Sequence, residues 1–176
     1  MITDKDKVII EFLTNIPCYS NTINKIFYPG LKSQRYCNQR LNYLYDYGCI
    51  KRKRKHASEF YFYWAGKGKR EPNDKHKTHY DLIARAYLWI TKQEYNILNC
   101  DIQKQHGTVK PDLLLEIEKD GRKNILPIEI ERSNNIENTI RKYEDTEFHK
   151  ILLFSKRPFK KETSIEIIDI RLNELY

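Results

Sequence analysis

No stretch of this sequence has the length of a transmembrane helix, and its first residues, M-I-T-D-K-D-K, lack the pattern of a signal peptide. The four cysteines, Cys18, Cys37, Cys49 and Cys100, contain no C-x-x-C pair. These absences argue against a membrane protein, an exported protein and a zinc site built from paired cysteines. We therefore expect a cytoplasmic protein with reduced thiols, without zinc and without a membrane partner.

The chain does contain an excess of basic residues, with a formal net charge of +8 over 176 residues. Residues 1–78 hold 16 Lys and Arg against 7 Asp and Glu, whereas residues 79–176 hold 16 against 17. A basic surface favours a polyanionic partner, although charge alone does not distinguish DNA, RNA and membrane. The asymmetry indicates two modules with different roles. We place them at residues 1–66 and 78–176, joined by a polar linker over 67–77.

Three short helices are expected in the first module. Apolar residues recur at helical spacing from Asp4 or Asp6 to Ile16, again after Ser20, and a third time between Ser33 and Gly48. Opposite its apolar stripe, the third helix carries polar side chains that can hydrogen-bond to base edges and phosphates. These candidate DNA-binding residues are Gln34, Arg35, Asn38, Gln39 and Asn42.

A basic run follows the third helix and consists of Lys51, Arg52, Lys53, Arg54 and Lys55. The strand-like segment Phe60–Trp64 comes next, with Tyr61 and Tyr63 alternating against Phe60, Phe62 and Trp64. Three helices followed by a basic hairpin resemble a winged helix-turn-helix domain. The resemblance implies that the third helix enters the major groove of double-stranded DNA and that the basic run contacts phosphates. The alternative is a solvated turn beside an ordinary surface helix.

The stretch from Val109 to Glu131 organises the second module. Apolar and polar residues alternate on both sides of Asp120-Gly121, which is typical of a β-hairpin. If both apolar faces cover one core, Asp112, Glu129 and Glu131 emerge together on the opposite face. Clustered carboxylates repel one another unless a cation compensates them. The pattern predicts a site for Mg²⁺ or Mn²⁺ at Asp112 and Glu129, against the alternative of solvent-facing residues on an amphipathic hairpin.

The rest of the second module predicts a small sheet domain. A helix over 77–90, a strand over 95–102, the hairpin, a helix after Asn134 or Asn135, and strands over 149–154 and 165–170 follow in order. This order gives a mixed α/β sheet. The expected fold class is therefore α+β, with an N-terminal winged helix-turn-helix followed by the sheet domain.

Pro111-Asp112 on one strand and Glu129-Ile130-Glu131 on the next resemble the PD-(D/E)xK nuclease-like superfamily. The resemblance implies that Asp112 and Glu129 hold one or two Mg²⁺ ions and that the third residue positions or deprotonates the attacking water. Glu131 stands where lysine is usual in that superfamily. This departure leaves open an active metal-dependent DNA endonuclease and an inactive binding module.

The full order of motifs is similar to the replication-relaxation family of plasmids, phages and other mobile elements. The matching pieces are His79, Pro111-Asp112, Glu129-x-Glu131-Arg132-Ser133 and Arg141-Lys142-Tyr143, behind a winged helix. The resemblance implies a DNA-binding accessory protein of replication or mobilisation (conjugation) that binds an origin. It also implies His79 as a further active-site residue and a relaxase or replication initiator as partner. A homodimer stays open, as do two other functions, a targeted endonuclease and a transcriptional repressor.

Overall fold

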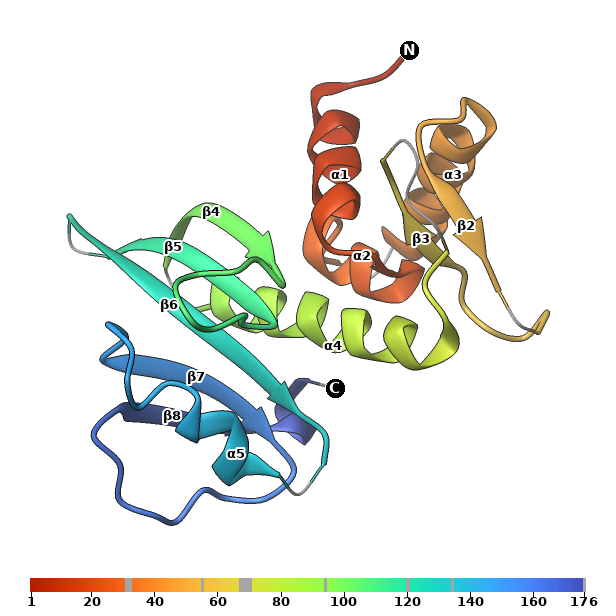
Figure 1. Ribbon diagram of the computed structural model, residues 1–176. Coiled ribbons are helices and arrows are strands. Elements are labelled where there is room, and N and C mark those ends of the chain that lie inside the picture. The colour runs from red at the N-terminus through yellow and green to blue at the C-terminus, as the bar shows by residue number, and fades with distance from the viewer. Residues whose placement is uncertain are drawn as a thin grey trace. The chain divides into compact units, whose positions relative to one another are not determined.

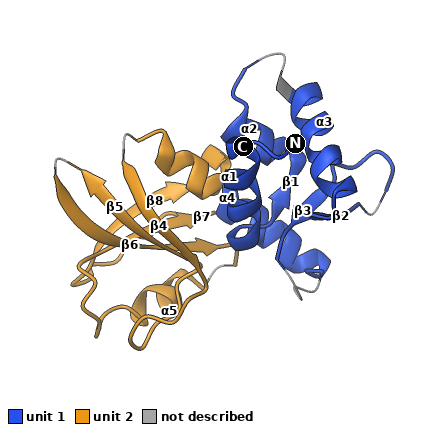
Figure 2. Cartoon of the chain, turned by 90° about the horizontal axis from the view of Figure 1, so that it is seen from above, with its two compact units in different colours: residues 1–84 blue, residues 85–176 orange. Residues whose placement is uncertain are grey.

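The computed structural model describes residues 1–30, 33–54, 56–66, 71–93, 95–119, 121–133 and 135–175. The chain divides into two compact units, residues 1–84 and 85–176 (Figure 2). Each unit combines helices with its own sheet, so the α+β class predicted from the sequence is confirmed. None of the described helices has the length and hydropathy needed to span a bilayer.

The first unit contains three complete helices, the beginning of a fourth and a small antiparallel sheet (Figure 1). Its elements are α1 (Asp4–Asn15), β1 (Cys18–Tyr19), α2 (Ser20–Phe27), α3 (Ser33–Asp46), β2 (Lys51–Lys53) and β3 (Phe62–Trp64). The strand order is β1-β3-β2. The helices end as the sequence predicts, because Pro17 follows α1 and Gly48 follows α3 with a φ of 71°. Their apolar stripes form the core, in which Ile9, Leu13, Ile23, Leu41 and Leu44 are fully buried.

A buried ion pair connects α1 to α3. Asp6 is fully buried and accepts a hydrogen bond from Arg40 Nε at 2.7 Å. Its Oδ2 also accepts one from the backbone N–H of Thr3 at 2.6 Å, which completes a capping box at the start of α1. The hydrogen bonds from Arg40 hold the pKa of Asp6 well below its usual range despite burial. One carboxylate therefore both caps a helix and joins two helices.

The alternation expected over Phe60–Trp64 is wrong. Phe62, Tyr63 and Trp64 are all buried, whereas Phe60 is 52% exposed. Phe60 precedes β3, so the side-chain alternation of a strand does not extend to it. β3 is also the central strand of the sheet, between β1 and β2, and both of its faces are covered.

The linker expected over 67–77 includes residues 67–70, which lie outside the described residues. Its later part belongs to α4 (Asp74–Thr91), and the boundary between the two units falls inside this helix. The helix begins at Asp74, earlier than the sequence predicted. The reason is a side-chain cap, because Asn73 Oδ1 accepts a hydrogen bond from the backbone N–H of His76 at 3.0 Å.

The second unit is built on a five-stranded sheet with strand order β4-β5-β6-β7-β8. Its elements are β4 (Asn96–Ile102), β5 (Leu113–Lys119), β6 (Arg122–Glu131), α5 (Ile136–Arg141), β7 (Lys150–Ser155), β8 (Glu166–Arg171) and the 3-10 helix η1 (Leu172–Leu175). β4, β5 and β6 pair antiparallel, whereas β6, β7 and β8 pair parallel. The expected β5–β6 hairpin is present, with Gly121 at a φ of 74°, while Asp120 lies outside the described residues.

Both faces of this sheet are covered. On one face, α5 and Tyr143 pack in a core cluster with Leu153 of β7, and Figure 1 shows α5 alongside β7 and β8. On the other face, the ring of Trp89 from α4 lies 5.8 Å from that of Phe154, measured between centroids. The alternation of the hairpin placed the three carboxylates on the face opposite its apolar core. This face is partly covered by α5, and the coverage sets the environment of Glu129.

We expect Asp6→Ala to lower the free energy of unfolding by about 3 kcal/mol, because removing one partner of a buried ion pair leaves the other charge uncompensated. Denaturant unfolding followed by circular dichroism measures the loss. Asp4→Ala is the matched control, since it removes a carboxylate from the same helical turn, where the Asp4 side chain is 96% exposed. Equal losses for the two variants would contradict the role assigned to the Asp6–Arg40 pair.

Candidate functional site

Asp112, Glu129 and Glu131 lie at the same end of the β5–β6 hairpin. Asp112 directly precedes β5, and both glutamates lie near the C-terminal end of β6. Leu113 pairs with Ile128, so Asp112 lies beside Glu129 on one face of the sheet. Asp112 Oδ2 accepts a hydrogen bond from the backbone N–H of Ile130 at 2.9 Å. The hairpin therefore brings the three predicted carboxylates to one place.

Glu129 is buried, with 5% of its surface exposed. Its Oε1 accepts a hydrogen bond from the Tyr143 hydroxyl and lies 2.7 Å from the ammonium group of Lys142. Burial and then the charge of Asp112 raise the pKa of Glu129 from 4.5 to about 7, against the lowering effect of Lys142 and Tyr143. Burial also raises the pKa of Tyr143. A carboxyl group that titrates near neutral pH is suited to general acid or base chemistry.

Glu131 has a different environment from Glu129. Its Oε1 accepts hydrogen bonds from the backbone N–H and hydroxyl of Ser133, at 2.7 and 2.6 Å, and its Oε2 accepts one from the Thr139 hydroxyl at 2.6 Å. Burial acts to raise the pKa of Glu131, but these hydrogen bonds outweigh it and lower the pKa. Glu131 is therefore an ionised group whose two oxygens anchor the entry to α5.

The carboxylates fit a hard divalent ion in part. Carboxylate oxygens are the donors that Mg²⁺ prefers, and Mg²⁺ is commonly held by one or two carboxylates with water completing its shell. Asp112 and Glu129 supply two such groups. However, Lys142 already pairs with Glu129, and within the described ranges no three His, Cys, Asp or Glu side chains are grouped so as to hold a metal ion. The site predicted for Mg²⁺ or Mn²⁺ at Asp112 and Glu129 stays a prediction, and Lys142 would have to move away from Glu129 for an ion to bind there.

Three further residues complete the comparison with the sequence. His79 lies half-buried on α4 in the first unit, so it is described separately from the carboxylates of the second unit. Tyr143 is fully buried. Sequence reasoning missed that Tyr143 and Lys142 both contact Glu129. The available indication was their position two and three residues after Ile140, at the end of the helix that covers the carboxylate face.

The predicted recognition face of α3 is exposed in the first unit. Arg35, Asn38, Gln39 and Asn42 are exposed, and Gln34 is half-buried. The Gln34 side-chain amide donates a hydrogen bond to Asn38 Oδ1 at 3.0 Å. The opposite stripe of α3 is buried in the core of the unit, so the amide and guanidinium groups of α3 project from a helix that is fixed by its packing.

Arg52 joins this face of α3 to β2. Its guanidinium donates a hydrogen bond to Asn42 Oδ1. It also lies over the rings of Tyr45 and Tyr61, at 4.2 and 4.5 Å from their centroids, in contacts that stabilise a cation. Arg54 lies 4.5 Å from the Tyr61 centroid. The polar face of α3 and the basic strand β2 therefore form one continuous surface, which we call the α3–β2 surface.

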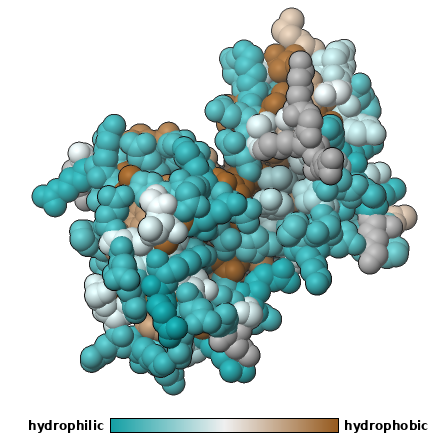
Figure 3. All heavy atoms as spheres, in the orientation of Figure 1, coloured by the Kyte–Doolittle hydropathy of each residue, from teal (hydrophilic) through white to brown (hydrophobic). Residues whose placement is uncertain are grey.

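Most of the basic run contributes to the α3–β2 surface. Lys51 and Lys53 are exposed on β2, and Arg54 follows them, while Lys55 lies outside the described residues. Lys53 pairs with Glu71 at 2.8 Å, and Glu71 also pairs with Lys77 of α4 at 2.7 Å. Figure 3 shows mainly hydrophilic residues over α3 and β2. The basic run is thus strand β2 and its continuation, in which Arg52 contacts Asn42 of α3 and Lys53 pairs with Glu71.

No protein-family model, curated protein or solved structure matches this chain. The resemblances noted in the sequence therefore stay predictions. What the molecule can do has to be argued from the two groups of residues described above, the α3–β2 surface of the first unit and the carboxylates of the second.

We expect the stability of the protein to fall as pH rises from 4.5 to about 7. The folded state raises the pKa of Glu129 across this range and so binds its proton more tightly than the unfolded state does. Each unit of difference is worth about 1.4 kcal/mol, so a few kcal/mol of the unfolding free energy are lost. Urea unfolding at several pH values measures this loss, which Glu129→Gln should reduce.

Glu131→Gln is the control for this titration. The pKa of Glu131 is lowered in the folded state, so its contribution to stability is present above its unfolded pKa and is lost as pH falls. Removing the Glu131 carboxylate should therefore not change the loss of unfolding free energy between pH 4.5 and about 7. Parallel curves for the wild type and Glu129→Gln would show that Glu129 does not titrate as described.

Proposed function

We propose that this chain binds double-stranded DNA through the α3–β2 surface. The observation that carries the proposal is the contact of Arg52 with Asn42, which makes a polar helix face and a basic strand one surface. Amide and guanidinium side chains such as Asn38, Gln39 and Arg35 suit the base edges of the major groove. Lysine and arginine side chains on the adjacent strand suit phosphates, which position a protein on the duplex.

The arrangement of the first unit supports this proposal. The order α1-β1-α2-α3-β2-β3, with a three-stranded antiparallel sheet, resembles that of a winged helix. In that interpretation α3 is the recognition helix and the β2–β3 hairpin is the wing. A helix in the major groove would contact base edges, and a basic arm beside it would contact the phosphates of the same duplex.

The charge of β2 and Arg54 also supports a polyanionic partner. Lys53 is compensated by Glu71, whereas Arg52 and Arg54 rest on aromatic rings and the amide of Asn42, which are neutral groups. Closely spaced cations repel one another, and a row of phosphates relieves that repulsion. An accessory role at an origin of replication or mobilisation, with a relaxase or initiator as partner, and the alternative of a repressor remain predictions from the resemblance.

A second candidate function is a metal-dependent DNA endonuclease in the second unit. It is favoured by the position of Asp112 beside Glu129 on one sheet face. A Mg²⁺ ion there would supply a Lewis acid and a more acidic bound water. Asp112 and Glu129 would hold it, and Tyr143 would keep Glu129 oriented through its hydrogen bond. Lys142 would have to leave Glu129, and Glu131 would stay bound to Ser133 and Thr139.

We expect Lys51→Ala/Arg54→Ala to weaken duplex binding and to reduce the slope of log affinity against log salt by about 2, since each phosphate contact contributes about 0.9. Fluorescence anisotropy with a labelled duplex at several salt concentrations measures both effects. Lys7→Ala/Lys75→Ala removes the same charge from exposed positions on α1 and α4 and should keep the wild-type slope. The same reduction in both double variants would mean that β2 and Arg54 do not contact the phosphates.

For the endonuclease candidate, we expect the wild type to nick supercoiled plasmid in the presence of Mg²⁺ or Mn²⁺ and Asp112→Ala to leave it intact. Glu118→Ala, which removes a carboxylate from the far end of β5, should nick like the wild type. Agarose gels of the time course give the rates. DNA binding without nicking by all three proteins would exclude the candidate and leave the DNA-binding proposal standing.

A further inference from the structure

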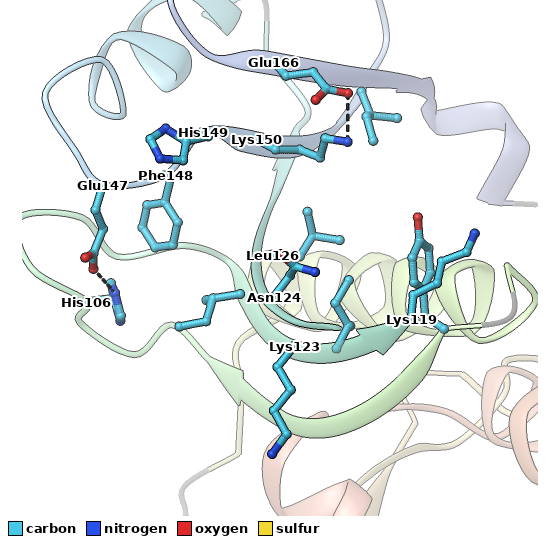
Figure 4. Close-up of a pocket in the computed structure, with 14 residues that line it drawn as sticks. His106, Lys119, Lys123, Asn124, Leu126, Glu147, Phe148, His149, Lys150 and Glu166 are labelled. Carbon is cyan, nitrogen blue, oxygen red and sulfur yellow. Dashed lines mark hydrogen bonds and ion pairs between the residues drawn. The ribbon is translucent and has the colours of Figure 1, made fainter. Parts of the chain in front are cut away.

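The first part of β6 has an open edge on the side of β7. β6 pairs with β5 from its first residue, but its pairing with β7 begins only at Ile128. Lys123, Asn124 and Ile125 are exposed, and a pocket of about 600 Å³ lies beside them (Figure 4). Residues 147–149 also line this pocket, and within the described part of the chain they do not pair with β6. A stretch of strand is therefore exposed where a neighbouring strand could lie.

The backbone groups on the open edge belong to Lys123 and Ile125. The N–H of Ile130 donates a hydrogen bond to Asp112 Oδ2 at 2.9 Å, so it points toward the β5 side. Backbone groups of successive strand residues point alternately to the two sides, and the β5–β6 register is continuous. The N–H and C=O groups of Lys123 and Ile125 therefore point away from β5. Pro127 agrees with this alternation, because its missing N–H falls on the same side and costs no bond to β5.

The side chains along the open edge alternate between the two faces of the sheet. Lys123 and Ile125 lie on the face that carries Glu129, whereas Arg122 and Asn124 lie on the opposite face. Ile125 is 50% exposed, although it is a large aliphatic residue on a strand. An extended peptide beside β6 would meet both sets of side chains, because its own side chains alternate in the same way. The geometry of the edge therefore fits an added strand.

The charge of the open edge selects among possible strands. Arg122 and Lys123 are adjacent and exposed, and neither forms an ion pair with an acid of the described residues. Glu118 lies opposite Lys123, but its Oε2 accepts a hydrogen bond from Asn96 Nδ2 at 3.1 Å. Lysine on an edge strand disfavours pairing with a like-charged strand, and a second copy of this edge would add two more cations to a short strand pair. Two neighbouring acids on the added strand would instead compensate the two cations, one on each face.

We propose that the open edge of β6 binds an acidic, extended peptide segment of a partner protein by strand addition. The segment pairs with the N–H and C=O groups of Lys123 and Ile125. Two neighbouring acids of the segment meet Arg122 and Lys123, and an apolar residue two positions further along covers Ile125. The site gives the second unit a protein-docking role that uses neither the α3–β2 surface nor the carboxylates of the candidate metal site.

The test uses the full chain and the fluorescein-labelled peptide E-E-T-I-T-E-E, which has the required spacing of acids and isoleucine in both strand directions. We expect saturable binding in fluorescence anisotropy, weakened about fivefold in Arg122→Ala/Lys123→Ala. Lys156→Ala/Lys160→Ala removes the same charge from two exposed positions of the same unit that do not line the pocket, and it should bind like the wild type. The peptide K-K-T-I-T-K-K should not bind.

Two substitutions of Ile125 separate the backbone from the side chain. Ile125→Thr keeps the N–H and removes apolar contact alone, so it should weaken binding about threefold. Ile125→Pro also removes the N–H that points to the open edge, without removing a bond to β5, and should abolish binding. Circular dichroism checks the folding of both variants. Amide hydrogen exchange of the wild type needs no substitution, and the acidic peptide should slow exchange at Lys123 and Ile125 but not at Asn124, whose N–H points toward β5.

Three results would overturn the proposal. They are the absence of saturable binding, an equal loss of affinity in Arg122→Ala/Lys123→Ala and Lys156→Ala/Lys160→Ala, and unchanged exchange at Ile125 under saturating peptide. Equal affinity for the acidic and the basic peptide would overturn the assignment of an acidic partner. Self-association of the free chain in analytical ultracentrifugation, abolished by Ile125→Pro, would assign the edge to a second copy of this chain instead.

Discussion

The pairing of Leu113 with Ile128 is the constraint on which the second unit depends. Side chains alternate along a strand, so a shift of β6 by one residue would turn its apolar residues away from their core and move Glu129 to the other face. With the observed register, Asp112 and Glu129 lie together and α5 covers them. β6 also begins six residues before its pairing with β7, which starts at Ile128.

Two arginines of the first unit show how burial determines the role of a charge. Arg40 pairs with the buried carboxylate of Asp6, so its positive charge is compensated inside the first unit. Arg52 contacts an amide and two aromatic rings, which orient the guanidinium without neutralising it. The first contact stabilises the packing of α1 against α3. The second keeps a positive charge at the junction of α3 and β2, where a polyanion can reach it.

Local patterns predicted most elements of the fold but not what covers them. Proline, glycine and apolar spacing placed the helices, and the alternation on both sides of Asp120-Gly121 placed the hairpin with its carboxylates on one face. The burial of Glu129 could not be predicted, because alternation identifies a face and not the helix that packs on it. The offset between the start of β6 and its pairing with β7 had no local indication either, since it depends on where two strands distant in the sequence begin to pair. The early start of α4 depends on a single side-chain cap at Asn73.

The contacts that stabilise the buried carboxylate of Glu129 would compete with a metal ion for it. Burying a carboxylate is unfavourable unless a cation or hydrogen bonds compensate it, and Lys142 and Tyr143 supply both. A divalent ion would compensate the same charge more strongly and would compete with Lys142. Lys142 is at the end of α5 and its side chain is 38% exposed, so its ammonium group is already partly hydrated. The ammonium group that compensates Glu129 therefore comes from the C-terminal end of α5, and neither strand of the hairpin has to supply a cation.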